Sequence, residues 1–85
     1  MTPRQRSQNA IKEIEQAIVD LLAQHGDWMS RPDIADKLDI ESWYEGGHGG
    51  YLSGGICKAL VARGVLEFRQ EGPRGTTYYR VKNSN

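Results

Sequence analysis

The sequence has only one cysteine and lacks any long apolar run. Its single cysteine, Cys57, excludes an intramolecular disulfide. No apolar run approaches the ~20 residues that a membrane-spanning helix needs. The first nine residues also lack the apolar segment of a secretory signal. We therefore expect a soluble, cytoplasmic protein that makes no contact with a membrane.

The chain also lacks net charge, but the charge that it has is unevenly distributed. The formal net charge is +0 and the sequence pI is 6.7, below the strongly basic value typical of tight DNA binders. Residues 13–45 carry nine acidic and two basic side chains, whereas residues 46–85 carry six basic and two acidic ones. Such a chain presents either a basic face to phosphate and an acidic face elsewhere, or simply two solvated surfaces.

Recognisable catalytic and metal-binding patterns are missing as well. His48 lies in the segment Gly-Gly-His-Gly-Gly and has no second ligand at the spacing of a metal site. The glycines match neither the phosphate-loop nor the dinucleotide-binding pattern. No arrangement of nucleophile and base is apparent. We therefore predict that the protein is not an enzyme and holds no metal or cofactor.

The 85 residues fit one small domain, whose pattern divides into a tail and a folded part. Residues 1–9 are polar and carry Arg4 and Arg6, so we predict a flexible basic tail there and a domain over 10–82. Apolar residues at helical spacing then predict a first helix ending at Gly26. A second short helix begins after Ser30, which is suited to cap it, with Pro32 in its first turn.

Residues 39–51 interrupt the helical pattern with a glycine-rich segment, which we predict to be mobile over 45–50. A third helix follows from Leu52 and ends at Gly64. Leu66 and Phe68 alternate with charged residues as in a half-buried strand, and a returning strand ends at Val81. The tip between these strands is Gly-Pro-Arg-Gly, and a short strand at Trp28–Met29 is placed to join them.

This order of elements resembles the winged helix-turn-helix superfamily over residues 10–82. Three segments carry the resemblance: the capped second helix with the strand before it (26–38), the third helix entering the hairpin (56–66), and the returning strand (75–81). The resemblance implies an α+β fold of three helices and a small antiparallel sheet, with the hairpin as the wing. It also implies a DNA-binding protein, either a small transcription regulator or an accessory module, that uses its third helix and wing.

The residues expected to contact DNA follow from that placement. A helical wheel with Leu52, Ile56, Ala59 and Leu60 inside places Ser53, Gly54, Cys57, Lys58 and Val61 outside. The predicted phosphate contacts are Ser53, Lys58, Arg69, Arg74 and Arg80. Gly54 and Gly55 remove base-reading side chains from the start of the third helix, so we expect double-stranded DNA to be bound with low sequence specificity.

Several of these residues have a second interpretation. Arg69, Tyr78 and Arg80 form either a phosphate-and-stacking surface or a cross-strand cluster that stabilises the sheet. Trp28 is expected in the core. Trp43 and Tyr44 either close the core or form an interface with a protein partner or a second copy.

The alternative function is therefore a winged-helix protein–protein interaction module with an acidic surface around the second helix. That surface comprises Asp33, Asp36, Asp39, Glu41 and Glu45. The predicted core, common to both functions, comprises Ile14, Ile18, Leu21, Ile34, Leu38, Leu52, Ile56, Leu60, Leu66, Phe68 and Tyr79.

Overall fold

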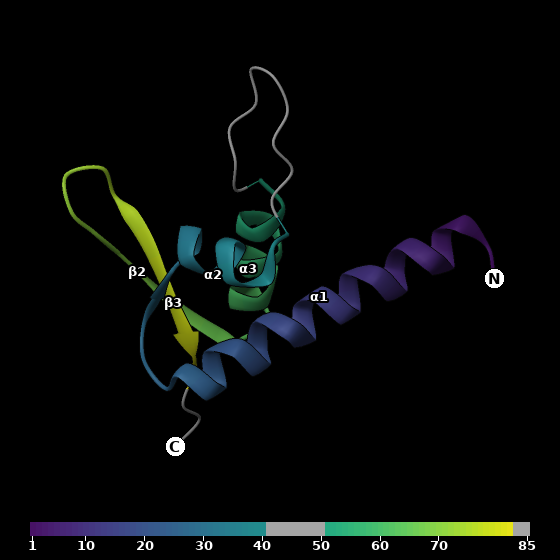
Figure 1. Ribbon diagram of the computed structural model, residues 1–85, viewed down its shortest axis with the longest axis horizontal. Coiled ribbons are helices and arrows are strands. Elements are labelled where there is room, and N and C mark those ends of the chain that lie inside the picture. Colours follow the sequence, from purple (N-terminus) through teal and green to yellow (C-terminus); the bar gives the residue numbers. More distant parts are fainter. Residues whose placement is uncertain (41–50, 83–85) are drawn as a thin grey trace.

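The computed structural model describes residues 1–40 and 51–82, and over these the fold is α+β. Three helices and a three-stranded antiparallel sheet follow one another along the chain. They are α1 (Pro3–His25), β1 (Met29–Ser30), α2 (Arg31–Leu38), α3 (Tyr51–Ala62), β2 (Leu66–Glu71) and β3 (Thr76–Val81). Figure 1 shows α1 running past α2 and α3, with its N-terminal end directed away from the β2–β3 hairpin.

Helix α1 begins earlier than the sequence pattern predicts. The Thr2 hydroxyl accepts a hydrogen bond from the Gln5 backbone N–H, and the Gln5 side chain accepts one from the Thr2 backbone N–H. This reciprocal cap, followed by Pro3 in the first turn, starts a helix directly. The predicted flexible tail over 1–9 is therefore helical from Pro3, although its side chains are exposed. Ile11, also on this projecting part, remains 45% exposed.

The predicted helix boundaries around β1 are confirmed. Gly26 ends α1 with a backbone φ of 75°, and its N–H donates to the Leu22 carbonyl. This left-handed conformation favours glycine because a Cβ would crowd the backbone. The Ser30 hydroxyl accepts a hydrogen bond from the Asp33 N–H at 3.3 Å and so caps α2. These two caps fix the short connection from which β1 joins the sheet.

The sheet has the order β1-β3-β2, so β3 is central. Phe68 lies opposite Tyr79, which in turn lies opposite Met29. Successive side chains of a strand point to opposite faces. Leu66, Phe68, Tyr79 and Met29 therefore share the face toward the helices. Glu67, Arg69, Tyr78 and Arg80 share the outer face.

The core lies between this sheet and the three helices. Its buried members are Ile18, Leu22, Met29, Ile34, Ala35, Ile56, Cys57, Leu60, Leu66 and Tyr79. Ile14, Leu21 and Leu38 pack against it while partly exposed. The prediction of the core is wrong for two residues, since Leu52 is 41% exposed and Phe68 is 55% exposed. Phe68 does lie on the helix-facing side of β2, but the sheet there extends beyond the helices that cover Leu66.

Over the described ranges, 1–40 and 51–82, none of the helices combines the length and the apolar character needed to cross a bilayer. The 23-residue α1 is long, but its N-terminal half is polar and exposed.

Candidate nucleic-acid interface

Helix α3 presents a different side to the core than the helical wheel predicts. Ile56 and Leu60 are buried as expected, but Ser53 and Cys57 are both 0% exposed. The predicted placement of Ser53 and Cys57 on the outer side is therefore wrong, and Ser53 is not accessible to a phosphate in this structure. Small side chains at these two positions let α3 approach the core closely, which turns Leu52 and Ala59 outward.

The two glycines of α3 have different surroundings. A Cβ on Gly54 would lie 3.4 Å from the Arg31 side chain, whereas a Cβ on Gly55 would meet nothing within 4 Å. Gly54 is half-buried because the Arg31 side chain passes over it from α2. Gly55 lies on the exposed side of the helix. The absence of a side chain at Gly54 thus makes room for Arg31 of α2. Gly55 leaves the backbone of α3 exposed to solvent.

A hollow separates α3 from the β2–β3 hairpin. Its lining residues are Lys58, Val61, Phe68, Gln70, Thr77 and Tyr79. Lys58 is exposed and contributes the positive charge on the helix side. Phe68 contributes an exposed aromatic ring on the strand side, which sequence reasoning assigned to the core. The sequence signal that could have found it is the run of polar residues Arg69-Gln70-Glu71 directly after Phe68, which indicates that this part of the strand is not covered by a helix.

Arg74 lies at the tip of the hairpin. Gly72 and Gly75 both have positive φ values, 86° and 64°, and the Gly75 N–H donates to the Gly72 carbonyl at 3.1 Å. The tight turn leaves Arg74 exposed. Neither Arg74 nor Lys58 forms an ion pair with any residue that the structure describes. Both cations therefore retain their full charge for a partner.

Arg69 and Arg80 lie together on the outer face of the sheet, against Trp28. The guanidinium carbon of Arg69 is 4.6 Å from the Trp28 ring centroid, and that of Arg80 is 4.4 Å from it. Arg69 also lies 5.8 Å from the Tyr78 ring centroid. The predicted clustering of Arg69 with Arg80 is thus observed, but the ring between them is that of Trp28. Trp28 is half-buried by these arginines on the outer face.

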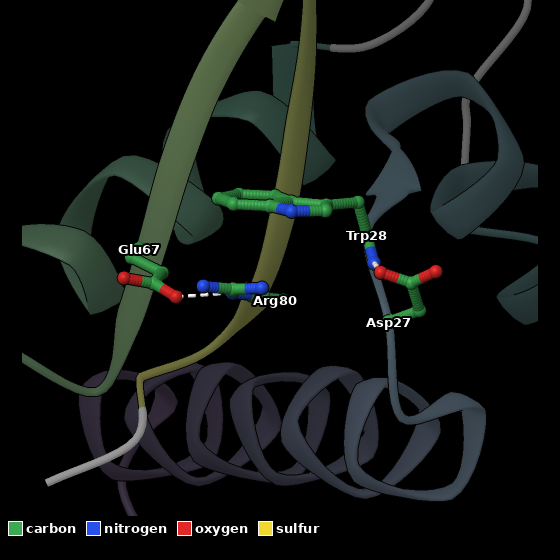
Figure 2. A network of polar contacts seen from close by, with 4 residues as sticks. All are labelled: Asp27, Trp28, Glu67 and Arg80. Carbon is green, nitrogen blue, oxygen red and sulfur yellow. Dashed lines mark hydrogen bonds and ion pairs between the residues drawn. The ribbon is translucent and has the colours of Figure 1, made fainter. Parts of the chain in front are cut away.

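Each of these arginines also has an acidic neighbour. Arg80 forms an ion pair with Glu67, the residue directly opposite it on β2 (Figure 2). The Arg69 Nε lies 3.3 Å from the Glu71 carboxylate. The Arg80–Glu67 pair joins β3 to β2 and matches the cross-strand stabilising interpretation, whereas the Arg69–Glu71 pair lies within β2. The charge available to a phosphate at Arg69 and Arg80 is correspondingly reduced.

The buried side of α3 perturbs two titratable groups. Burial raises the pKa of the Cys57 thiol to about 11, against the opposing effect of the Arg31 positive charge. Burial also raises the pKa of Tyr79, and the Cys57 charge acts in the same direction. Cys57 therefore stays a neutral thiol at neutral pH, which suits a small core residue.

Some predicted features fall outside the described residues. They are the Trp43 and Tyr44 interface, the acidic residues Glu41 and Glu45, His48, and the glycine-rich segment predicted to be mobile. Across 1–40 and 51–82, the structure gathers no group of three or more His, Cys, Asp or Glu side chains suited to a metal ion.

Comparisons of this chain with protein-family models, with curated proteins and with solved structures yield no match.

Proposed function

We propose that this protein binds double-stranded DNA through its phosphate backbone, as a winged-helix-like module of a small transcription regulator or accessory factor. The observation that carries the proposal is the arrangement of two unpaired cations. Lys58 borders the hollow where α3 adjoins the hairpin, and Arg74 occupies the exposed hairpin tip. Most protein–DNA hydrogen bonds go to phosphate and sugar, and cations on a helix and a hairpin tip suit such contacts.

The layout of the elements supports the same proposal. Three helices precede a hairpin, β1 adds a third strand beside β3, and α3 leads directly into β2. This layout is compatible with a winged helix-turn-helix, in which the third helix and the hairpin contact DNA. Fold alone does not assign a function, so the cations of the candidate interface have to support it.

The exposed side of α3 argues for low sequence specificity. From Leu52 to Ala62, its exposed positions are Leu52, Gly55, Lys58, Ala59 and Ala62. Base edges are distinguished by bidentate hydrogen bonds from side chains such as arginine, asparagine and glutamine. Lys58 is the single hydrogen-bonding side chain among these positions. The helix therefore has the means to hold a phosphate and little means to read a base sequence.

A titration of a labelled duplex at several salt concentrations tests the proposal. We expect the logarithm of the binding constant to fall with the logarithm of salt concentration, with a slope of roughly −3 to −5. Arg74→Ala should weaken binding to all sequences alike and make the slope shallower by about one. Lys12→Ala, which removes the same charge from the exposed part of α1, is the matched control and should change the slope less. A slope near zero, or no binding at low salt, contradicts the proposal.

A specific observation favours a second function, a protein–protein interaction module. The exposed side of α3 is mostly apolar or small, with Leu52 at 41% exposure and Phe68 nearby at 55%. Exposed apolar surface of this kind suits a protein partner better than a phosphate backbone. Asp33, Asp36 and Asp39 are exposed on the neighbouring α2 and its C-terminal cap, which suits a basic partner. Absence of duplex binding at low salt would make this second function the preferred one.

A further inference from the structure

The outer edge of β2 is the surface from which we draw a further inference, one that goes beyond DNA binding and does not depend on it. In the sheet order β1-β3-β2, β2 pairs with β3 on one side. Within the described residues, no strand pairs with its other side. An uncovered edge strand of six residues offers backbone donors and acceptors to another strand.

The hydrogen-bonding pattern shows which residues of β2 face that free edge. The Lys82 N–H donates to the Val65 carbonyl at 3.0 Å, and the register places these two residues opposite each other. Hydrogen-bonded and non-hydrogen-bonded pairs alternate along an antiparallel ladder. Glu67 and Arg69 therefore direct their backbone groups toward β3. Leu66, Phe68 and Gln70 direct their N–H and C=O groups toward the free edge.

One side chain of this strand is unusual for an edge that stays unpaired. Phe68, at the centre of the strand, is 55% exposed and is one of the large hydrophobic residues that the structure leaves in solvent. Edge strands of monomeric proteins commonly carry a charge or a proline at such a place. Here the charged residues Glu67, Arg69 and Glu71 flank the edge on the outer face.

We propose that two copies of this chain associate through their β2 edges, antiparallel and about a two-fold axis at Phe68, to form one continuous six-stranded sheet. In this register Phe68 lies opposite the partner's Phe68, and its outward backbone groups form a hydrogen-bonded pair across the axis. Glu67 lies opposite the partner's Arg69, and Arg69 lies opposite the partner's Glu67. Opposite charges directly across from each other stabilise a strand pair.

The neighbouring registers are disfavoured by charge. An axis at Arg69 would place Arg69 opposite the partner's Arg69 and Glu67 opposite the partner's Glu71. An axis at Glu67 would place Glu67 opposite the partner's Glu67. Like charges directly opposite destabilise a strand pair. The alternation Glu67, Phe68, Arg69 therefore favours the axis at Phe68 over an axis at either neighbour. An axis at Gln70 would also pair opposite charges, Arg69 with the partner's Glu71, and the cross-linking experiment below distinguishes the two registers. An isologous contact of this kind closes at two copies.

The contact is small, so we expect a weak dimer that forms at micromolar or higher concentration. Sedimentation equilibrium over a wide range of protein concentration measures it. Arg69→Glu and Glu67→Arg should each give a monomer, because each places like charges opposite one another. Mixing the two variants should restore a dimer, because every facing pair is then of opposite charge. Circular dichroism checks that both variants are folded.

A cross-linking experiment tests the register itself. Under oxidising conditions, Phe68→Cys should give a disulfide-linked dimer, because opposite residues of a hydrogen-bonded pair have Cα atoms ~5.5 Å apart, within disulfide range. Gln70→Cys is the matched control on the same strand and face. It lies opposite the partner's Leu66, so its thiol is far from its counterpart and should not cross-link. Equal cross-linking of the two variants would refute the register. Failure of the mixed charge variants to associate, with wild-type protein monomeric throughout, would refute the dimer.

The two proposals fail separately. Duplex DNA binding and sedimentation equilibrium, both measured on wild-type protein over the same range of concentrations, test the two proposals independently. A monomeric wild-type protein that binds DNA overturns the dimer alone. A dimer that does not bind DNA overturns the proposed function alone.

Discussion

The guanidinium of Arg80 lies 4.4 Å from the centroid of the Trp28 ring, and Figure 2 shows the two planar groups stacked on each other. Trp28 immediately precedes β1, which is only two residues long, whereas Arg80 belongs to the central strand β3. Two residues of ladder provide few hydrogen bonds. The stacking of Trp28 against Arg80 therefore helps to hold the start of β1 against the rest of the sheet.

Replacing the ring should test that role. We expect Trp28→Leu to lower the free energy of unfolding by about 1–3 kcal/mol, because it removes two cation–π contacts and a half-buried aromatic surface. Trp28→Phe should lower it less, because a ring remains between Arg69 and Arg80. Urea unfolding followed by circular dichroism measures both. Equal stability of Trp28→Leu and wild type would show that the cluster does not support the fold.

Because of Cys57, the free energy of unfolding should fall as the pH rises above about 9. Its pKa is raised from 9.0 to about 11 in the folded state, so the unfolded chain loses this proton at a lower pH than the folded chain. The stabilisation is thus fully present below about pH 9 and is lost as the pH rises toward 11, by at most ~1.4 kcal/mol per pH unit for this group. The raised pKa of Tyr79 acts in the same direction. Thermal unfolding at pH 8, 9 and 10 measures the slope.

Cys57→Ala provides the control for that slope. It removes the thiol and leaves Tyr79 in place, so the fall in stability above pH 9 should become shallower. An unchanged slope would assign the alkaline transition to other groups. In the native protein the thiol should also react slowly with a disulfide reagent until urea exposes it, because the thiolate is the reactive form.

Two glycines with equally open surroundings should respond oppositely to alanine. A Cβ would meet nothing within 4 Å at either Gly26 or Gly55. Gly55 lies inside α3, so Gly55→Ala should stabilise by about 0.5–1 kcal/mol. Gly26 has a φ of 75°, so Gly26→Ala should destabilise by about 1–2 kcal/mol. Thermal unfolding of both variants checks the prediction, and a gain in stability at Gly26 would contradict the left-handed cap.

The first turns of α1 should unfold without lowering the stability of the rest of the domain. Thr2→Ala removes the cap, yet residues 3–10 pack against little and are exposed. We expect helical circular dichroism to fall while the urea midpoint stays nearly constant, because fraying there is local. Thr2→Ser should retain the helical signal. A large shift of the midpoint would show that this segment packs on the core.

Local chemistry made several features predictable from the sequence. Ser30 caps α2 as its type and position predict, because a capping hydroxyl needs only the backbone that follows it. Gly26 and the Gly-Pro-Arg-Gly tip similarly specify a helix end and a turn. The alternation from Leu66 onward predicted the two hairpin strands. The sequence also carried a local signal that our interpretation missed, since Thr2, Pro3 and Gln5 start α1 early.

Tertiary packing decided the rest. Hydrophobicity favoured Leu52 for the core of α3, but the close approach of the helices selected the smaller Ser53 and Cys57. The Trp28 ring contacts Arg69 and Arg80 because the sheet order places β1 beside β3. Phe68 remained exposed because the helices end before the sheet does. The sequence alone determined where elements begin and end, since caps and turns act over a few residues. Which faces meet depends on volumes and strand neighbours far apart in the chain, and only the folded structure decides those.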